Sequence, residues 1–431
     1  MSARKPPGKP SRRPVARPLT LESLEGRLCP SQYLLVTDNT HNAVLRYDGT
    51  DGHFIDTFVP GSTSGMTAPD LGIIPDPSGQ DFLVDGFGSH NVTRYSLADG
   101  SPDPAPGQSG ADFVPPGSGG LVAPEGISYG PNGNLYVANQ LTQGGQVLRY
   151  DGATGAFRDV FLDAGSRPVQ ANDLHFGPDG NLYADNFAPP GQLFRFDGST
   201  GAFLPGDDRS GPNFIDPTGG YANGFAWGPD GNLYVAFEPS NAVTTQGSIL
   251  RFDATTGDPL PAPGQSGAVF VAPGAGGINF IDGIAFDDAG NLYATNQFAN
   301  GQGDVRKFDG TTGDPLGTFV LAASGGLGTP GGLLFYSAPN SPVAHRPVGL
   351  VPEGAALDSR PGAGPVGVPF PMPVAPSLLD SLPPVSATAD LGAANLPALT
   401  DAATGQPAAP VGLPSPADLD PLGLDLAAGL S

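Results

Sequence analysis

The stretch Ala222–Ala236, ANGFAWGPDGNLYVA, recurs along the chain, and its repetition predicts the fold. Similar stretches stand at Ala123–Ala138, Ala171–Ala184 and Ile281–Ala294. Each contains a small polar or acidic residue, a short apolar run, a turn such as G-P-D-G-N, and a strand pattern beginning with L-Y. Proline presets φ at the first corner of the turn, and glycine supplies the left-handed position that closes a hairpin. Each stretch therefore predicts two antiparallel strands.

A second repeated feature is a strand that ends in R-Y-D-G or R-F-D-G. Its basic residue recurs at intervals of 48, 55, 46, 56 and 56 residues. The positions are Arg46, Arg94, Arg149, Arg195, Arg251 and Lys307. A period near 50 residues with about four strands per unit is typical of propeller blades. We expect the innermost strand before P-D-G, the second at NLYVA, the third at LRYDG, and the fourth directly after the following turn.

The two ends of the repeat region are complementary. The region begins at Tyr33 with a second-strand pattern, LLVTDN, and ends at Pro330–Tyr336 with an innermost strand, PGGLLFY, that has no successor. Pairing of these segments would complete one blade and leave no open edge. The sequence therefore predicts an all-β fold, a six-bladed β-propeller closed by its N- and C-terminal strands. The phrase PAPGQSGA occurs at Pro104–Ala111 and again at Pro261–Ala268, three blades later, which indicates an older three-blade duplication.

Composition divides the 431 residues into three parts: a basic leader at 1–30, the propeller at 31–338, and a tail at 339–431. The leader is predicted to be disordered, although LESLEGRL within it resembles the LEPR-xLL-type N-terminal motif of exported or surface proteins in some bacteria. That resemblance implies an extracytoplasmic location. The Pro- and Ala-rich tail is also predicted to be disordered, with a short binding or export signal in DLDPLGLDLAAGL as the alternative.

Charge and cysteine content exclude several classes of protein. The net charge is −23, and seven of the 19 basic residues fall in the leader, so the propeller offers no basic face for nucleic acid. The single cysteine, Cys29, excludes an intramolecular disulfide framework and a cysteine-based metal cluster. No apolar run reaches the length of a transmembrane helix. We expect a monomer.

The repeated pattern x-G-(I/F)-x-(F/W)-x-P-D-G-N-L-Y-V-A resembles the NHL-repeat propellers across nearly all of Tyr33–Tyr336. The gluconolactonase family, also called the senescence marker protein family, and the streptogramin lyases are similar in architecture. The resemblance implies that the residues opening the six innermost strands surround one mouth of a central channel. We call them the openers: Asp70 or Leu71, Glu125, Asn172, Asn223, Asp282 and Gly331.

The openers suggest a site for Ca²⁺ or Mg²⁺, because these ions prefer carboxylate and amide oxygens. Asn172, Asn223 and Asp282 match three consecutive metal-ligand positions of the gluconolactonase family. That family places its glutamate two blades before the first asparagine, which here corresponds to Asp70, whereas Glu125 stands one blade before. Either Asp70 substitutes or Glu125 reaches across. The resemblance implies that the metal would activate a lactone carbonyl and a water, with Asp282 or a neighbouring acid as general base.

Two classes of function follow. A generic repeat array favours a binding or scaffold module whose ligand, a protein, a glycan or a small molecule, lies at the channel mouth. The match at Asn172, Asn223 and Asp282 favours a metal-dependent lactone hydrolase. A streptogramin-type lyase would need histidines beside the metal, and His175 is the one histidine on an innermost strand near the openers. Openers are also polar in NHL repeats simply because the mouth is solvated, so the metal site stays a hypothesis.

Other recurring residues have structural interpretations. One inner-strand position is aromatic in five blades, which predicts packing between blades. Those residues are Tyr129, Phe176, Trp227, Phe286 and Phe335. The recurring arginines, Arg149 among them, are expected to be solvated or to form ion pairs between blades. The D-G-x-T-G turns, as at Asp151–Gly155, are explained by hairpin chemistry without bound calcium.

Overall fold

The computed structural model describes residues 32–140, 145–163, 170–186, 191–204, 214–215, 220–239, 246–298 and 301–337. These residues belong to one unit of the chain, Met1–Ala356, and a second unit covers Leu357–Ser431. The predicted leader at 1–30 and the predicted tail at 339–431 lie outside the described residues.

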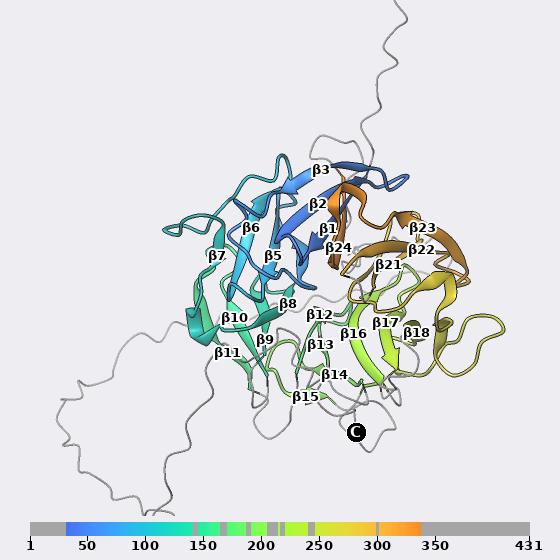
Figure 1. The fold of residues 1–431 in the computed structure, drawn as a ribbon. Helices are drawn as coiled ribbons and strands as arrows, with labels where there is room; N and C mark the ends of the chain where they lie inside the picture. The colour runs from blue at the N-terminus through green and yellow to red at the C-terminus, as the bar shows by residue number, and fades with distance from the viewer. Residues whose placement is uncertain are drawn as a thin grey trace, which may run out of the picture. The chain divides into compact units, whose positions relative to one another are not determined.

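Six four-stranded antiparallel sheets make up the fold, and we number them as blades 1 to 6 (Figure 1). Blade 1 consists of β24 (Pro330–Tyr336), β1 (Tyr33–Asp38), β2 (Ala43–Asp48) and β3 (Phe54–Val59). Blade 2 consists of β4 (Ile73–Pro75), β5 (Asp81–Gly86), β6 (Asn91–Ser96) and β7 (Asp112–Val114). Blade 3 consists of β8 (Pro124–Tyr129), β9 (Leu135–Asn139), β10 (Gln146–Tyr150) and β11 (Phe157–Asp163).

The remaining blades follow the same order of pairing. Blade 4 consists of β12 (Leu174–Phe176), β13 (Leu182–Asp185), β14 (Leu193–Phe196) and β15 (Phe203–Leu204). Blade 5 consists of β16 (Gly220–Trp227), β17 (Leu233–Pro239), β18 (Ser248–Phe252) and β19 (Val269–Val271). Blade 6 consists of β20 (Ile284–Phe286), β21 (Leu292–Gln297), β22 (Gly303–Phe308) and β23 (Pro315–Val320).

Helical structure in this part of the chain is limited to three short 3₁₀ turns. They are η1 (Ser118–Gly120), η2 (Ala275–Gly277) and η3 (Ser324–Gly326). Among the residues described, no helix is long and apolar enough to cross a membrane.

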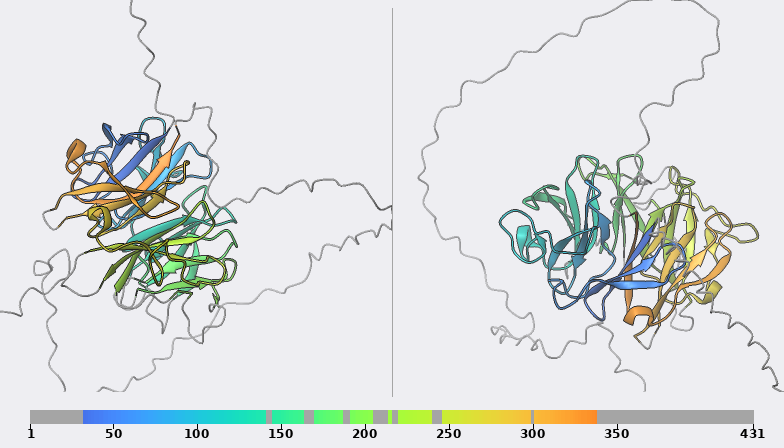
Figure 2. Two further views of the ribbon diagram at one scale, coloured as in Figure 1. Left: turned by 90° about the vertical axis from the view of Figure 1, so that its right-hand side faces the viewer. Right: turned by 90° about the horizontal axis from the view of Figure 1, so that it is seen from above.

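The ring closes as the sequence predicts. The C-terminal strand β24 pairs with β1, and Tyr33 stands opposite Tyr336 in the register. In Figures 1 and 2 the orange β24 accordingly lies beside the blue strands of blade 1. A strand of each blade also contacts the innermost strand of the next blade, and the last of these contacts joins blade 6 to blade 1. The six-bladed β-propeller is therefore confirmed.

The fourth strands of blades 2 and 5 differ from the prediction. They do not directly follow the turn after the third strand, but lie inside the glycine-rich passages, at β7 and β19. The segments directly after the turn make isolated bridges at Pro102 and Pro259. Both segments contain three prolines within five residues, which remove the N–H donors that a longer ladder needs. The two PAPGQSGA phrases precede β7 and β19, at corresponding places three blades apart.

The recurring aromatic residues pack between blades as predicted. A tyrosine on the second strand of one blade meets the inner-strand aromatic ring of the next blade at a steep angle, which suits the opposite charges of ring edge and ring face. The ring centroids are 4.7 Å apart for Tyr136–Phe176, 4.9 Å for Tyr183–Trp227, 4.9 Å for Tyr234–Phe286 and 4.7 Å for Tyr293–Phe335.

The recurring arginines form ion pairs within a blade, where the sequence suggested pairs between blades. Arg149 on β10 pairs with Asp159 on β11, and Arg46 on β2 pairs with Asp56 on β3. Several of these cations also lie over an aromatic ring of the same blade, as Arg149 does over Phe161. The recurring arginine position therefore contributes to packing within each blade.

Candidate functional site

The openers stand at irregularities of the innermost strands. In β8 and β16 the register shifts at Glu125 and Asn223, so each lies in a β-bulge followed by a glycine. Bulges redirect side chains at the ends of sheets, and the opener-plus-glycine pair of the sequence produces that geometry here. Gly224 has a φ of 97°, and a Cβ there would lie 2.3 Å from the carbonyl oxygen of Asp282. Glycine thus lets the openers of blades 5 and 6 approach closely.

Three predicted metal ligands are brought into contact. The Nδ2 of Asn172 donates to the Oδ1 of Asn223 at 3.0 Å, and the Nδ2 of Asn223 donates to the Oδ1 of Asp282 at 2.9 Å. Two glutamines extend this row at its ends: Gln140 donates to Asn172, and Gln297 donates to Asp282. We call these five residues the amide chain. It spans the openers of blades 4, 5 and 6.

Sequence reasoning missed both glutamines, although a positional pattern marks them. Gln140 and Gln297 each stand five residues after the leucine that begins the second strand, at Leu135 and Leu292. Glu238 occupies the same position in blade 5, and its Oε1 accepts the backbone N–H of Ile281 at 2.8 Å. Burial raises the pKa of Glu238 to about 7.

Among the described residues, the side chains of the other predicted acids form no hydrogen bond with the amide chain. Glu125 is 6% exposed, and its Oε2 has no hydrogen-bond partner in the part of the chain that the structure describes. Burial raises the pKa of Glu125 well above its ordinary value, and the charges of Asp70 and Asp85 add to the effect. Burial likewise raises the pKa of Asp70 to about 6. The remaining opener, Gly331, contributes no side chain.

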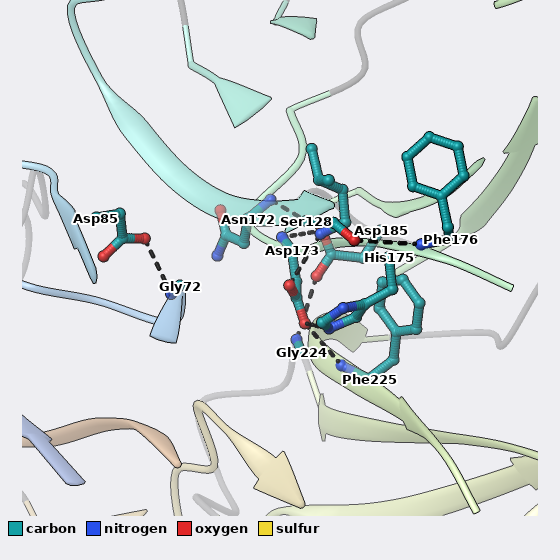
Figure 3. A network of polar contacts seen from close by, with 11 residues as sticks. Gly72, Asp85, Ser128, Asn172, Asp173, His175, Phe176, Asp185, Gly224 and Phe225 are labelled. Carbon is teal, nitrogen blue, oxygen red and sulfur yellow. Dashed lines mark hydrogen bonds and ion pairs between the residues drawn. The ribbon is translucent and has the colours of Figure 1, made fainter. Parts of the chain in front are cut away.

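Two fully buried aspartates on second strands support the openers, and sequence reasoning did not single them out. Asp185 accepts the backbone N–H groups of Asn172 and Asp173, both at 2.8 Å, and that of Gly224 at 3.2 Å (Figure 3). It therefore joins the openers of blades 4 and 5. Asp85 accepts the N–H groups of Asp70 and Gly72 at 3.0 and 2.9 Å. Burial raises the pKa of both carboxyl groups, while these hydrogen bonds oppose the rise.

A detectable signal for these aspartates was the last residue of the L-Y-V-A pattern in the second strand, where most repeats have a small residue. The six blades carry Thr37, Asp85, Ala138, Asp185, Ala236 and Thr295 there. The two threonines serve the same purpose as the aspartates. The Oγ1 of Thr37 accepts the N–H of Gly332, and the Oγ1 of Thr295 accepts the N–H of Gly283, both at 2.8 Å.

His175 forms a partly buried pair with Asp173, the residue that follows the opener Asn172. Its Nε2 lies 3.1 Å from the Oδ2 of Asp173, whose carboxylate also accepts the backbone N–H groups of Leu174 and Phe225. Figure 3 shows Asp173 and His175 facing each other beside Phe225. The sequence placed His175 near the openers but did not identify Asp173 as its partner.

The chemistry of the openers fits an oxygen-liganded cation with one condition. Within the described ranges, no three Asp, Glu, His or Cys side chains gather closely enough to hold an ion by themselves. An ion would therefore need the amide oxygens of Asn172 and Asn223, which at present accept hydrogen bonds within the amide chain. Glu125 contributes a buried oxygen, Oε2, that has no hydrogen-bond partner among the described residues.

Comparison with known proteins finds structural similarity at low sequence identity. No protein-family model matches the chain, and no curated protein matches it. A protein of unknown function from Bacteroides caccae has 13% identity and a TM-score of 0.48, covering 70% of this chain and 98% of that one. A gluconolactonase from Xanthomonas campestris has 16% identity and a TM-score of 0.43, covering 70% and 89%. A calcium-binding protein, regucalcin, from Agrobacterium tumefaciens has 16% identity and a TM-score of 0.39, covering 59% and 74%.

The solved structures that resemble this chain thus include gluconolactonase-like and regucalcin-like proteins. Similarity at these identities and TM-scores carries no argument about the activity of this chain, because one fold hosts many functions.

Proposed function

We propose that the chain is a binding propeller whose channel mouth takes up a divalent cation, Ca²⁺ or Mg²⁺, and through it an oxygen-bearing ligand. The observation that carries this proposal is the buried, unpartnered Oε2 of Glu125, in a mouth that also contains Asn172, Asn223 and Asp282. A buried carboxylate without a hydrogen bond is costly, and native proteins usually pair such a group with a donor or a cation.

Electrostatics supports a cation at this place. The pKa values of Glu125 and Asp282 are raised first by burial and then by neighbouring carboxylates, including Asp70. Like charges that share a small volume disfavour one another's ionised forms. A divalent ion would relieve this repulsion, whereas an anionic ligand would increase it. The residues that would hold the ion are Glu125, Asn172, Asn223 and Asp282, with Asp70 as the alternative carboxylate.

The donor set suits a hard cation because every candidate ligand atom is an oxygen. Binding would require the amides of Asn172 and Asn223 to leave their present hydrogen bonds. When bound, such an ion supplies a positive charge that attracts and polarises ligand oxygens.

Thermal unfolding of the full chain tests the proposal. Ca²⁺ or Mg²⁺ in 100-fold excess over its Kd should stabilise the protein by about 2.7 kcal/mol, seen as a rise in Tm over an EDTA sample. The variant Glu125→Gln should lose most of that rise, while Asp56→Asn, a matched acid exchange on the outer strand of blade 1, should keep it. If neither ion raises Tm, or if Glu125→Gln responds as the wild type does, the proposed cation site is wrong.

A second candidate function, lactone hydrolysis, is favoured by the state of Asp282. This side chain is half-buried, is oriented by Asn223 and Gln297, and has a pKa raised well above its ordinary value, first by burial. A carboxylate with a raised pKa is a better general base at neutral pH than an ordinary one. A panel of lactones should then be hydrolysed by the wild type, and Asp282→Ala should lower kcat at least 100-fold. Equal rates in the two proteins would exclude Asp282 as the base.

A further inference from the structure

Basic and acidic residues are strongly segregated along the chain. Residues 1–21 carry six basic residues and no acidic one: Arg4, Lys5, Lys9, Arg12, Arg13 and Arg17. The propeller region, 31–338, contains 10 basic and 32 acidic residues. A short cationic segment is thus joined to a strongly anionic domain. Opposite charges held on one chain attract each other, most strongly at low ionic strength.

Close backbone approach brings the acidic openers together on one side of the mouth. A Cβ on Gly331 would lie 2.6 Å from the carbonyl oxygen of Asp70, and one on Gly72 would lie 2.6 Å from that of Glu125. A Cβ on the glycine that follows Asp282 would lie 2.8 Å from the carbonyl oxygen of Gly331. The openers of blades 6, 1, 2 and 3 are therefore in contact in that order. We call Asp282, Asp70 and Glu125 the acidic arc.

The cations of the propeller do not neutralise the acidic arc. In the described ranges, arginines and lysines form ion pairs with aspartates elsewhere in the blades, as Arg46 does with Asp56. None of these ion pairs involves an opener. The acidic arc therefore has no cationic partner among the residues that the structure describes.

The acidic arc also contains an acceptor that is not in use. Glu125 is 6% exposed, and its Oε2 has no hydrogen-bond partner among the described residues. Burial raises the pKa of Glu125, and the charges of Asp70 and Asp282 are among those that raise it further, so the three carboxylates act on one another. Asp70 and Asp282 are partly exposed. A cation that enters the mouth would therefore meet these two first and Glu125 last.

The leader is long enough to reach the mouth. It joins β1 near Gln32, at the end of the strand opposite Asp38, and Asp38 stands opposite Pro330, next to the opener Gly331. A route around blade 1 passes four strands, one strand length of about 20 Å, and four strands again, roughly 50 Å in all. Lys9 lies 23 residues before Gln32. An extended chain of that length spans about 75 Å.

Three carboxylates suit an ammonium group better than a guanidinium group. An ammonium has three donors on one atom, whereas a guanidinium presents a planar fork that fits a single carboxylate. The flexible four-carbon stem of lysine can also enter a narrow opening while the backbone stays outside. The leader has two lysines, Lys5 and Lys9.

We propose that Lys5 or Lys9 of the leader places its ammonium group at the acidic arc, and that the leader thereby competes with a divalent cation for the mouth. The tether favours this contact, because a flexible linker keeps the ammonium at a local concentration on the order of mM. The leader is then a regulator of cation uptake. This regulation rests on the proposed cation site, whereas the lysine contact itself requires no bound ion.

Cross-linking of the full chain tests the contact. A carbodiimide joins a lysine amine to a carboxylate only where the two touch, and mass spectrometry identifies the joined peptides. In EDTA at low salt, Lys5 or Lys9 should be joined to Asp70, Glu125 or Asp282. In a mixture of ¹⁴N- and ¹⁵N-labelled protein, the joined peptides should carry one label only, as expected within one chain. Absence of these peptides, or mixed labels throughout, would overturn the proposal.

Two double variants with equal loss of charge test the competition. If a lysine occupies the mouth for about nine tenths of the time, Lys5→Gln with Lys9→Gln should tighten the apparent Kd for Ca²⁺ about tenfold. Arg12→Gln with Arg13→Gln removes the same charge from the same segment and should leave the Kd within about twofold of the wild type. Equal tightening in both would show that leader charge acts diffusely, and would refute a specific lysine contact.

The two measurements keep this proposal distinct from the cation site. A lysine cross-link in EDTA supports the leader contact even if neither Ca²⁺ nor Mg²⁺ raises Tm. Conversely, a Ca²⁺-induced rise in Tm of the wild type without any lysine cross-link would leave the cation site standing and remove the leader proposal.

Discussion

The two halves of the channel mouth use the same repeat position in different ways. In blades 4, 5 and 6 the openers Asn172, Asn223 and Asp282 form a continuous row of hydrogen bonds. In blades 1, 2 and 3 the corresponding residues are Gly331, Asp70 or Leu71, and Glu125, and among the described residues the buried Oε2 of Glu125 has no hydrogen-bond partner. An amide both donates and accepts, so asparagines can be linked in series, whereas carboxylates only accept. The first half is therefore paired internally, whereas in the second half the described residues offer no hydrogen-bond donor to the Oε2 of Glu125.

The largest effect is expected at Asp185, whose carboxylate accepts backbone N–H groups in the paired half of the mouth. Asp185→Ala would leave the N–H groups of Asn172, Asp173 and Gly224 without an acceptor. We expect a loss of about 4 kcal/mol in the free energy of unfolding, because each buried unsatisfied N–H costs about 1–3 kcal/mol. Urea unfolding measures it, with Asp85→Ala, which frees two N–H groups, as the milder match. Equal losses below about 1 kcal/mol in both would contradict this account.

A charge placed in the paired half should also be costly. Asn223→Asp is isosteric but removes the donor that Asp282 accepts and sets two carboxylates 2.9 Å apart. In EDTA near pH 7 we expect a loss of about 3 kcal/mol in unfolding free energy, and Ca²⁺ should restore part of it. Asn134→Asp, in the turn between β8 and β9, provides the control, because among the described residues the side chain of Asn134 does not donate to a carboxylate. An Asn223→Asp protein as stable as the wild type would show that this half tolerates charge.

The opposite exchange in the unpaired half should stabilise the protein. Glu125→Gln removes a buried charge that has an unpartnered oxygen. In EDTA near pH 7 the free energy of unfolding should rise by about 2 kcal/mol, since a buried carboxylate without a partner is unfavourable. In Ca²⁺ the order should reverse, because the wild type gains a ligand that the variant lacks. Destabilisation in EDTA would mean that Glu125 has a stabilising partner.

Glu238 offers a further test, because this acid lies beside the paired half of the mouth. Its pKa is about 7 in the folded protein because of burial, above the ordinary 4.5. Its favourable contribution is present below about pH 4.5 and is lost as the pH rises through 7. Glu238→Gln should therefore match the wild type near pH 4 and exceed its stability by about 1 kcal/mol at pH 8, allowing for partial exposure. Denaturant unfolding at both pH values, in EDTA, measures this difference, and a constant difference would refute the shift.

Local features made much of the fold predictable from sequence. The G-P-D-G-N turns and the spacing of the R-Y-D-G strands predicted six blades, and the unmatched strands at Tyr33 and Pro330–Tyr336 predicted their closure. Prediction failed at the fourth strands of blades 2 and 5, where prolines at Pro102 and Pro259 limit pairing after the turn. A hairpin depends on neighbouring residues, but the choice of an outer strand depends on which later segment can supply N–H donors.

For the candidate site, too, the sequence and the tertiary structure determined different features. By itself the sequence identified the residues that open five of the six innermost strands, because those positions follow from the repeat, and it left Asp70 or Leu71 for blade 2. The tertiary structure decided which of them touch: it joined Asn172, Asn223 and Asp282, left Glu125 unpartnered, and added Gln140, Gln297 and Asp185. The contacts of Asn172 with Gln140 and Asn223 join different blades, so they arise only when the blades pack together and bring distant turns within hydrogen-bond distance.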